Sequence, residues 1–114
     1  MLCNQPFSAI VLIGIGVLTL DEYITEVLMR DLVGHDRRPA SFLIYLWLAA
    51  EQQRQGALVR ISYQDLAEST GVSKSSAQAA VGWLVRRKLL AAKKTTVTST
   101  PEYSILTPWR PIKK

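Results

Sequence analysis

The sequence predicts a small, mainly α-helical domain with one β-hairpin near its C-terminal end, and three observations carry this prediction. Two short helical patterns joined by a glycine turn occupy residues 61–90. Two β-prone runs, AAKKTTVTST and YSILT, follow them and are separated by a turn around Pro101 and Glu102. An amphipathic pattern upstream, in residues 20–33, predicts an additional N-terminal helix.

Local chemistry supports the two helices within residues 61–90. Ser62 and Asp65 form an S-x-x-D signature, in which the hydroxyl caps a helix and the acid complements the helix dipole. Gly71 follows at a point where a chain leaving a helix often needs a positive φ, and Ser73 is a second N-cap candidate. This is a helix-turn-helix pattern, which makes nucleic acid the leading partner.

The apolar spacing indicates which side of each helix is buried. Leu66 and Ala67 supply the buried side of the first helix. On the second helix, one stripe at a period near 3.6 is expected to face the core: Ala77, Ala80, Val81, Leu84 and Lys88. The opposite stripe is expected to face outward: Ser75, Ala79, Gly82 and Arg86.

Residues 39–109 resemble the winged helix-turn-helix domains of bacterial and phage regulators and of replication-initiator modules. The segment SYQDLAESTGVSKSSAQAAVGWLVRRKLL matches their second helix, turn and recognition helix without a gap. The resemblance implies a first helix over residues 39–53, a first strand over residues 58–61, and a hairpin that serves as the wing. One departure is Lys88, which stands where these proteins commonly end the recognition helix with a glycine.

The resulting organisation is a winged helix-turn-helix with an extra N-terminal helix. Residues 1–38 form an arm and an amphipathic helix for packing or dimerisation, residues 39–109 form the DNA-binding domain, and residues 110–114 form a basic tail. A chain of 114 residues can bury one core without disulfides. Cys3 is the only cysteine, which excludes an internal disulfide and favours a cytoplasmic protein.

Positive charge is concentrated in the half of the chain that carries the motif. Residues 1–56 hold four Lys and Arg against six Asp and Glu, a net charge of −2, whereas residues 57–114 hold ten against three, a net charge of +7. Cations placed on the recognition helix and the wing would form a phosphate-binding footprint. The alternative is a basic helix end and tail that are only solvated.

The resemblance and the charges together give a set of expected contacts with duplex DNA. The set comprises Ser62, Tyr63, Gln64, Ser73, Lys74, Ser75, Gln78, Ala79, Arg86, Arg87, Lys93 and Lys94. The amide of Gln78 can address adenine, Lys74 can reach guanine or a phosphate, and Ala79 can touch a thymine methyl group. For each serine, a helix cap or a solvated hydroxyl is an equally good interpretation.

Three functions remain open at this point. The first is a DNA-binding transcriptional regulator, and the second is a replication-initiator module that uses the same surface. The third is a protein-interaction module whose contact face would be Ala79, Gly82 and Trp83. Nothing in the sequence indicates an enzyme, since no nucleophile elbow, S-x-x-K or H-E-x-x-H spacing is present.

No cofactor, metal or small-molecule ligand is indicated either. His35 is the only histidine, and with Cys3 it cannot supply the usual ligand count of a zinc site. Gly14 and Gly16 suggest a dinucleotide loop, but Thr19 occupies the third glycine position and no further βαβ units follow.

The upstream half is expected to support and assemble the domain. Leu20, Ile24, Val27, Leu28 and Leu32 form the stripe of the amphipathic helix, which should end at Gly34. The run over residues 42–48 is apolar around the whole circumference of its helix and needs cover on more than one side. A second subunit would provide that cover in a homodimer. The N-terminal helix would provide it in a monomer.

Residues 8–20 contain no charge, but they are too few to span a bilayer, which takes about 20 apolar residues. The residues before them carry no Lys or Arg, which argues against an export signal. We therefore expect a strand or a loose arm that packs on the domain or on a partner, and no contact with a membrane.

Overall fold

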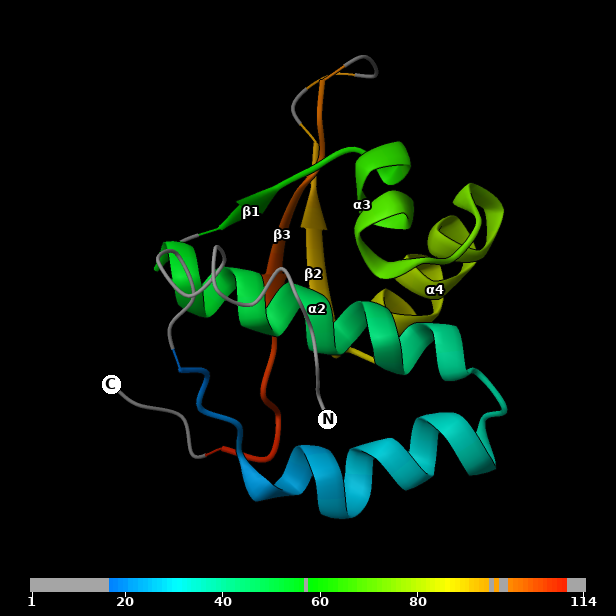
Figure 1. Cartoon of the computed structure of the whole chain (residues 1–114), viewed down its shortest axis with the longest axis vertical. Coiled ribbons are helices and arrows are strands. Elements are labelled where there is room, and N and C mark those ends of the chain that lie inside the picture. Colours follow the sequence, from blue (N-terminus) through cyan, green and yellow to red (C-terminus); the bar gives the residue numbers. More distant parts are fainter. Residues whose placement is uncertain (1–16, 57, 95, 97–98, 111–114) are drawn as a thin grey trace, which may run out of the picture.

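The helix α2 (Pro39–Gln55) runs through the middle of the molecule, and the other elements pack on two sides of it (Figure 1). The computed structural model describes residues 17–56, 58–94, 96 and 99–110. The N-terminal helix lies on one side of α2, and a three-stranded sheet with two further helices lies on the other (Figure 1). A single hydrophobic cluster joins both sides.

The ends of α2 follow from its sequence. Pro39 is its first residue, where a missing N–H has no cost, and Gly56 ends it with a left-handed φ of 72°. Ile44, Tyr45 and Leu48 are fully buried along it. The prediction that this apolar run needs cover on more than one side is confirmed, and the cover comes from the chain's own N-terminal helix together with the sheet and α4.

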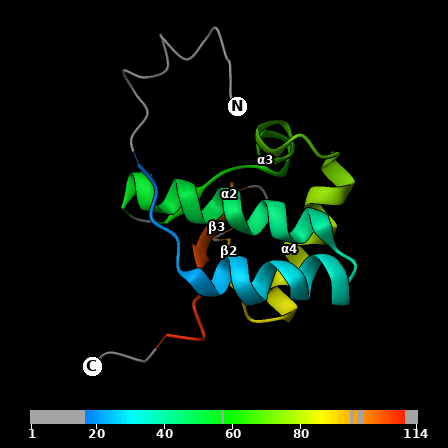
Figure 2. The same ribbon diagram turned by 60° about the horizontal axis from the view of Figure 1, so that its bottom comes forward.

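The N-terminal helix extends over residues 22–35 and lies beside α2 in both views (Figures 1 and 2). Its two π-helical segments are η1 (Ile24–Leu28) and η2 (Arg30–His35). The N–H of Met29 donates to the Ile24 carbonyl, five residues back. Such turns are wider than those of an α-helix. The buried side chains are accordingly spaced by four residues: Ile24, Leu28 and Leu32.

Parts of the prediction for this helix are wrong. Val27 is 42 % exposed, because residues three apart no longer share a face in the wider turn. Leu20 is 39 % exposed because it precedes the helix. The helix also passes Gly34 and ends at His35.

The prediction for residues 8–20 falls mostly outside the described residues. Of its described part, Val17 is 92 % exposed, and Thr19 exchanges two hydrogen bonds with the Gln53 side chain, at 2.7 and 2.8 Å. Among the described residues, no helix combines the length and the apolar character that a bilayer crossing requires.

The helices α3 (Tyr63–Thr70) and α4 (Lys74–Arg86) are joined by the predicted glycine turn. Ser62 and Ser73 cap them, since each hydroxyl accepts a backbone N–H three residues on at 3.1 Å. Gly71 adopts a φ of 83°. The predicted inner faces are buried and consist of Leu66, Ala67, Ala77, Ala80, Val81 and Leu84.

Lys88, predicted to lie on the buried stripe of α4, is instead exposed beyond the end of the helix. Its φ is 61°, the left-handed conformation that a glycine usually supplies at such a position. The N–H of Leu89 then donates to the Leu84 carbonyl at 2.9 Å, which closes the helix end. The helix α4 therefore ends without the glycine. The left-handed backbone conformation of Lys88 costs free energy that a glycine would not cost.

The sheet has the order β1-β3-β2 and is antiparallel throughout. Its strands are β1 (Val59–Arg60), β2 (Leu90–Lys93) and β3 (Glu102–Ile105). A strand falls in each of the two predicted β-prone runs, but β2 ends at Lys93 and β3 ends at Ile105, before the runs themselves end. The predicted turn around Pro101 and Glu102 is wrong, because Glu102 already pairs with Lys93 and Arg60. Residues 94–101 connect β2 to β3, and the structure describes 94, 96 and 99–101 of them.

We predict that Lys88→Gly raises the free energy of unfolding by about 1 kcal/mol, because glycine adopts the left-handed conformation without the steric cost that a Cβ brings. Urea unfolding followed by circular dichroism measures the change. Arg86→Gly is the control, since it removes the same charge inside the last turn of α4 and should lower stability by about 1 kcal/mol. A destabilised Lys88→Gly variant would contradict the account of the helix end.

Candidate nucleic-acid interface

The start of α3 holds three residues of the expected contact set, Ser62, Tyr63 and Gln64, and each side chain is engaged within the fold. The Ser62 hydroxyl caps the helix by accepting the Asp65 N–H. The Gln64 amide donates to Glu68 at 3.0 Å, and Tyr63 is half-buried against the core. What this helix start offers a phosphate is therefore its backbone N–H groups and not its side chains.

The first turns of α4 present most of the predicted base-reading residues. Lys74, Ser75, Gln78 and Ala79 are all exposed on the outer face. Ser73 caps the helix, and its hydroxyl lies 3.2 Å from that of Ser75. Within the described part of the chain, the Lys74 ammonium and the Gln78 amide make no hydrogen bond or ion pair. Their hydrogen-bonding groups are thus available to a partner outside the chain.

The far end of α4 is different in character. Trp83 is half-buried, and its indole N–H donates to Asp36 at 3.0 Å. The guanidinium of Arg38 lies 4.2 Å from the centroid of the indole ring, and that of the exposed Arg86 lies at 5.7 Å. Although Gly82 is exposed, the ring beside it is covered by a cation and offers little open apolar surface.

Arg87, predicted to contact DNA, points instead toward the N-terminal helix. Its guanidinium donates to Asp31 at 2.6 Å and also pairs with Asp36. The Asp36 side chain is only 5 % exposed. The hydrogen bond to Asp31 raises the pKa of Arg87 further, against the opposing effect of burial. We therefore leave Arg87 out of the candidate interface, because both of its partners belong to the fold.

His35 completes a cluster with the same two carboxylates. Its Nδ1 lies 3.1 Å from Asp36 and 3.8 Å from Asp31, and its side chain is 81 % exposed. In the described residues, these three side chains have ligand atoms within 4.8 Å of one another. Because Arg87 already pairs with both carboxylates, the cluster acts as an ion-pair network that ties the N-terminal helix to α4.

On the hairpin, Lys93 ends β2 and Lys94 follows it, and both are exposed. No acid among the described residues lies within ion-pairing distance of either ammonium. Arg60 on β1, one of the ten cations of residues 57–114, pairs with Glu102 across the sheet. The hairpin therefore contributes two free cations, while the cation of β1 is neutralised.

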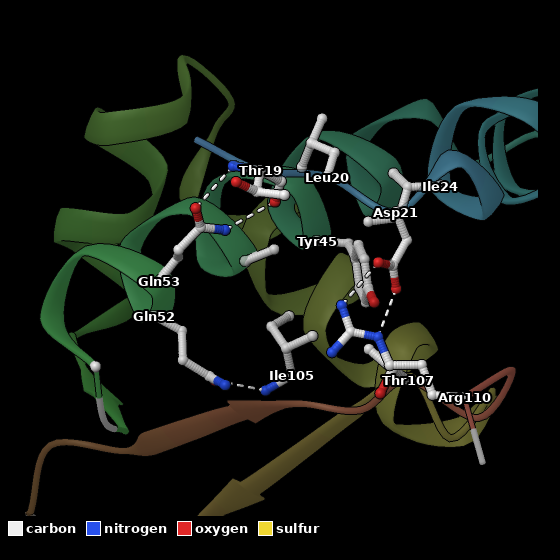
Figure 3. Close-up of a pocket in the computed structure, with 12 residues that line it drawn as sticks. Thr19, Leu20, Asp21, Ile24, Tyr45, Gln52, Gln53, Ile105, Thr107 and Arg110 are labelled. Atoms are coloured by element: carbon white, nitrogen blue, oxygen red, sulfur yellow. Dashed lines mark hydrogen bonds and ion pairs between the residues drawn. The ribbon is translucent and has the colours of Figure 1, made fainter. Parts of the chain in front are cut away.

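A cavity lies away from α3 and α4, between the segment before the N-terminal helix, the end of α2 and the C-terminal segment (Figure 3). It measures about 460 Å³. Arg110 binds Asp21 through two N–H groups at 2.6 and 2.8 Å, and these bonds, with one from Trp109, lower the pKa of Asp21. Gln52 accepts the Ile105 N–H at 2.8 Å. The hydrogen-bonding groups named here thus bind one another. Arg110, the first residue of the predicted basic tail, is paired with Asp21.

A smaller groove of about 210 Å³ adjoins the exposed face of α4. Arg37 and Arg38 line one wall, and Ser76 and Ala79 line the other. Sequence reasoning did not select the two arginines, because they precede residue 39, where the resemblance begins. Their position could be recognised only once α2 and α4 were seen to pack together.

Comparisons of the chain with protein-family models, with curated proteins and with solved structures find no match. The fold brings five residues of the predicted set together as exposed side chains of α4: Lys74, Ser75, Gln78, Ala79 and Arg86. Lys93 and Lys94 remain available on the hairpin.

We predict that Asp36→Asn lowers the free energy of unfolding by about 1–3 kcal/mol at pH 7, because it removes a carboxylate from the partly buried pair with Arg87. Burial acts to raise the pKa of Asp36, but contacts with His35, Trp83 and Arg87 outweigh it and hold the pKa below its ordinary value. The stabilisation is therefore present above about pH 4 and is lost as the pH falls through the folded-state pKa.

Thermal unfolding of the wild type and Asp36→Asn between pH 7 and pH 2 measures this effect. The difference between the two proteins should shrink as the wild-type carboxylate becomes protonated. Glu26→Gln is the control, because Glu26 is exposed on the N-terminal helix that Asp36 follows and its substitution should change stability by less than about 0.5 kcal/mol. A difference that is constant over the whole range would mean that the charge of Asp36 does not stabilise the fold.

Proposed function

We propose that this chain is a winged helix-turn-helix protein that binds duplex DNA and acts as a transcriptional regulator. In this proposal α4 is the recognition helix and enters the major groove, while the β2–β3 hairpin is the wing and follows the neighbouring backbone. Such a role would place the protein with the DNA of a prokaryotic cell, in its cytoplasm.

The order of the elements supports this proposal. A helix, a short strand, two helices joined by a tight turn and a hairpin follow one another from α2 to β3. The short strand pairs with the second strand of the hairpin, which gives the order β1-β3-β2. The order of the elements along the chain, with the caps at Ser62 and Ser73, supports the proposal because the resemblance implies the same order.

The single observation that carries the proposal is the state of the side chains on the first half of α4. Lys74 and Gln78 are exposed and make no bond within the described chain, whereas the arginines Arg60, Arg87 and Arg110 are all paired with acids. A free amide beside a free cation is the combination that reads base edges and neutralises phosphate.

A protein-interaction module using Ala79, Gly82 and Trp83 is the weaker candidate. Arg38 lies over the indole ring and Asp36 accepts its N–H, so a partner would first have to displace these groups. A replication-initiator role uses the same DNA-binding surface and differs only in the site that is bound.

Homodimerisation stays a prediction. The apolar run of α2 that motivated it is covered in part by Ile24, Leu28 and Leu32 of the same chain, while Leu43 of that run stays 46 % exposed. The pairing of two recognition helices would still suit a two-fold-symmetric DNA site. Light scattering of the purified chain, alone and with DNA, distinguishes a monomer from a dimer.

Binding to a random-sequence duplex should depend steeply on salt. Four cations of the expected contact set have no acid partner among the described residues: Lys74, Arg86, Lys93 and Lys94. If each contacts one phosphate, each contact should release about 0.9 counterion. The affinity for DNA should then fall roughly 150-fold between 50 and 200 mM salt. Fluorescence anisotropy over a salt series measures this slope. Binding that is insensitive to salt, or no binding at the lowest salt, would contradict the proposal.

Two substitutions should separate base reading from phosphate binding. After a preferred site is selected from a random library, Gln78→Ala should weaken binding to that site by about 1–3 kcal/mol and should leave non-specific binding nearly unchanged. Lys93→Ala should weaken all sequences alike and reduce the salt slope by about 1. Arg54→Ala is the control, because Arg54 pairs with Glu51 near the end of α2. Equal effects of all three substitutions would contradict these roles.

A further inference from the structure

The groove between α2 and α4 is a separate feature with its own chemistry. One wall is the start of α2 with Arg37 and Arg38 before it, and the other is the outer face of α4 at Ser76 and Ala79. Ala79 also belongs to the proposed DNA-reading face. The groove therefore continues that face toward the N-terminal side of α2.

The charge in this groove is positive and is not compensated. Arg37 is exposed and makes no ion pair within the described chain, and Arg38 is held in place over the Trp83 ring. Asp36, the neighbouring acid, binds Trp83 and Arg87 and does not line the groove. An anionic group is the chemical complement of such a surface.

The backbone conformation of Arg37 is an independent reason to assign a binding role to the Arg37 side chain. Its φ is 57°, a left-handed conformation that favours glycine or asparagine. The turn requires this conformation, since the N–H of Arg38 donates to the Leu32 carbonyl at 2.8 Å and closes the N-terminal helix. The turn does not require an arginine side chain. The chain thus carries a long cation at a position where a glycine would be less strained.

We infer that this groove binds a backbone phosphate of the DNA strand that borders α4, with Arg37 as the principal contact and Arg38 beside it. The inference rests on the proposed function and extends it to residues outside the region of resemblance. A phosphate held there would fix the depth and the angle at which α4 lies in the major groove.

The test compares Arg37→Gly with Lys88→Gly. Both substitutions remove an exposed cation from a left-handed backbone position, so each should raise the melting temperature by about 4 °C. Lys88 follows the C-terminal end of α4, and that end, at Arg86, is already about 10 Å along the helix from Ala79 at 1.5 Å per residue. The two variants are therefore matched in charge and in strain but differ in their place relative to the groove.

Fluorescence anisotropy of both variants with a random-sequence duplex over a salt series gives the readout. Arg37→Gly should weaken binding about fivefold and reduce the salt slope by about 0.9, whereas Lys88→Gly should retain the wild-type slope. Wild-type affinity and slope in Arg37→Gly, when the wild type binds DNA, would overturn the inference and leave the proposed function intact. Failure of the wild type to bind would overturn both.

Discussion

The need to cover α2 on two sides is the constraint on which the rest of the structure depends. Its apolar residues surround the helix, so one layer of packing cannot bury them. The N-terminal helix covers one side, and the sheet and α4 cover the other (Figure 1). The buried residues of α4, Ala77, Ala80, Val81 and Leu84, provide its packing against the core. The opposite face of α4 is therefore not needed for packing and is exposed to a partner.

Ion pairs within the chain determine which Lys and Arg side chains are available to bind DNA. Three arginines of the basic half are neutralised by acids from distant parts of the chain: Arg60, Arg87 and Arg110. The Arg87 pairs also hold the N-terminal helix in place against α4. Among the described residues, the cations without an acid partner include those on α4, on the hairpin and beside the groove at Arg37, together with Lys88 and Arg30.

Local signals predicted the caps, the glycine turn and the inner faces of α3 and α4, because each depends on residues within one or two turns. Local signals could not predict the conformation of Lys88 at the end of α4 or the ion pairs of Arg87. The helix stop at Lys88 depends on backbone bonds formed after the helix ends, and the pairing of Arg87 depends on acids more than 50 positions away. Arg37 was missed for the same reason, since only tertiary packing brings it beside Ala79.

The most direct test of the central claim is to map the surface that contacts DNA. Amide chemical shifts of the ¹⁵N-labelled chain, recorded while a short duplex is added, report each residue separately. The account predicts that the largest changes occur in the first half of α4, at Lys93 and Lys94, and at Arg37. Changes confined to Gly82 and Trp83, or spread evenly over the molecule, would contradict it.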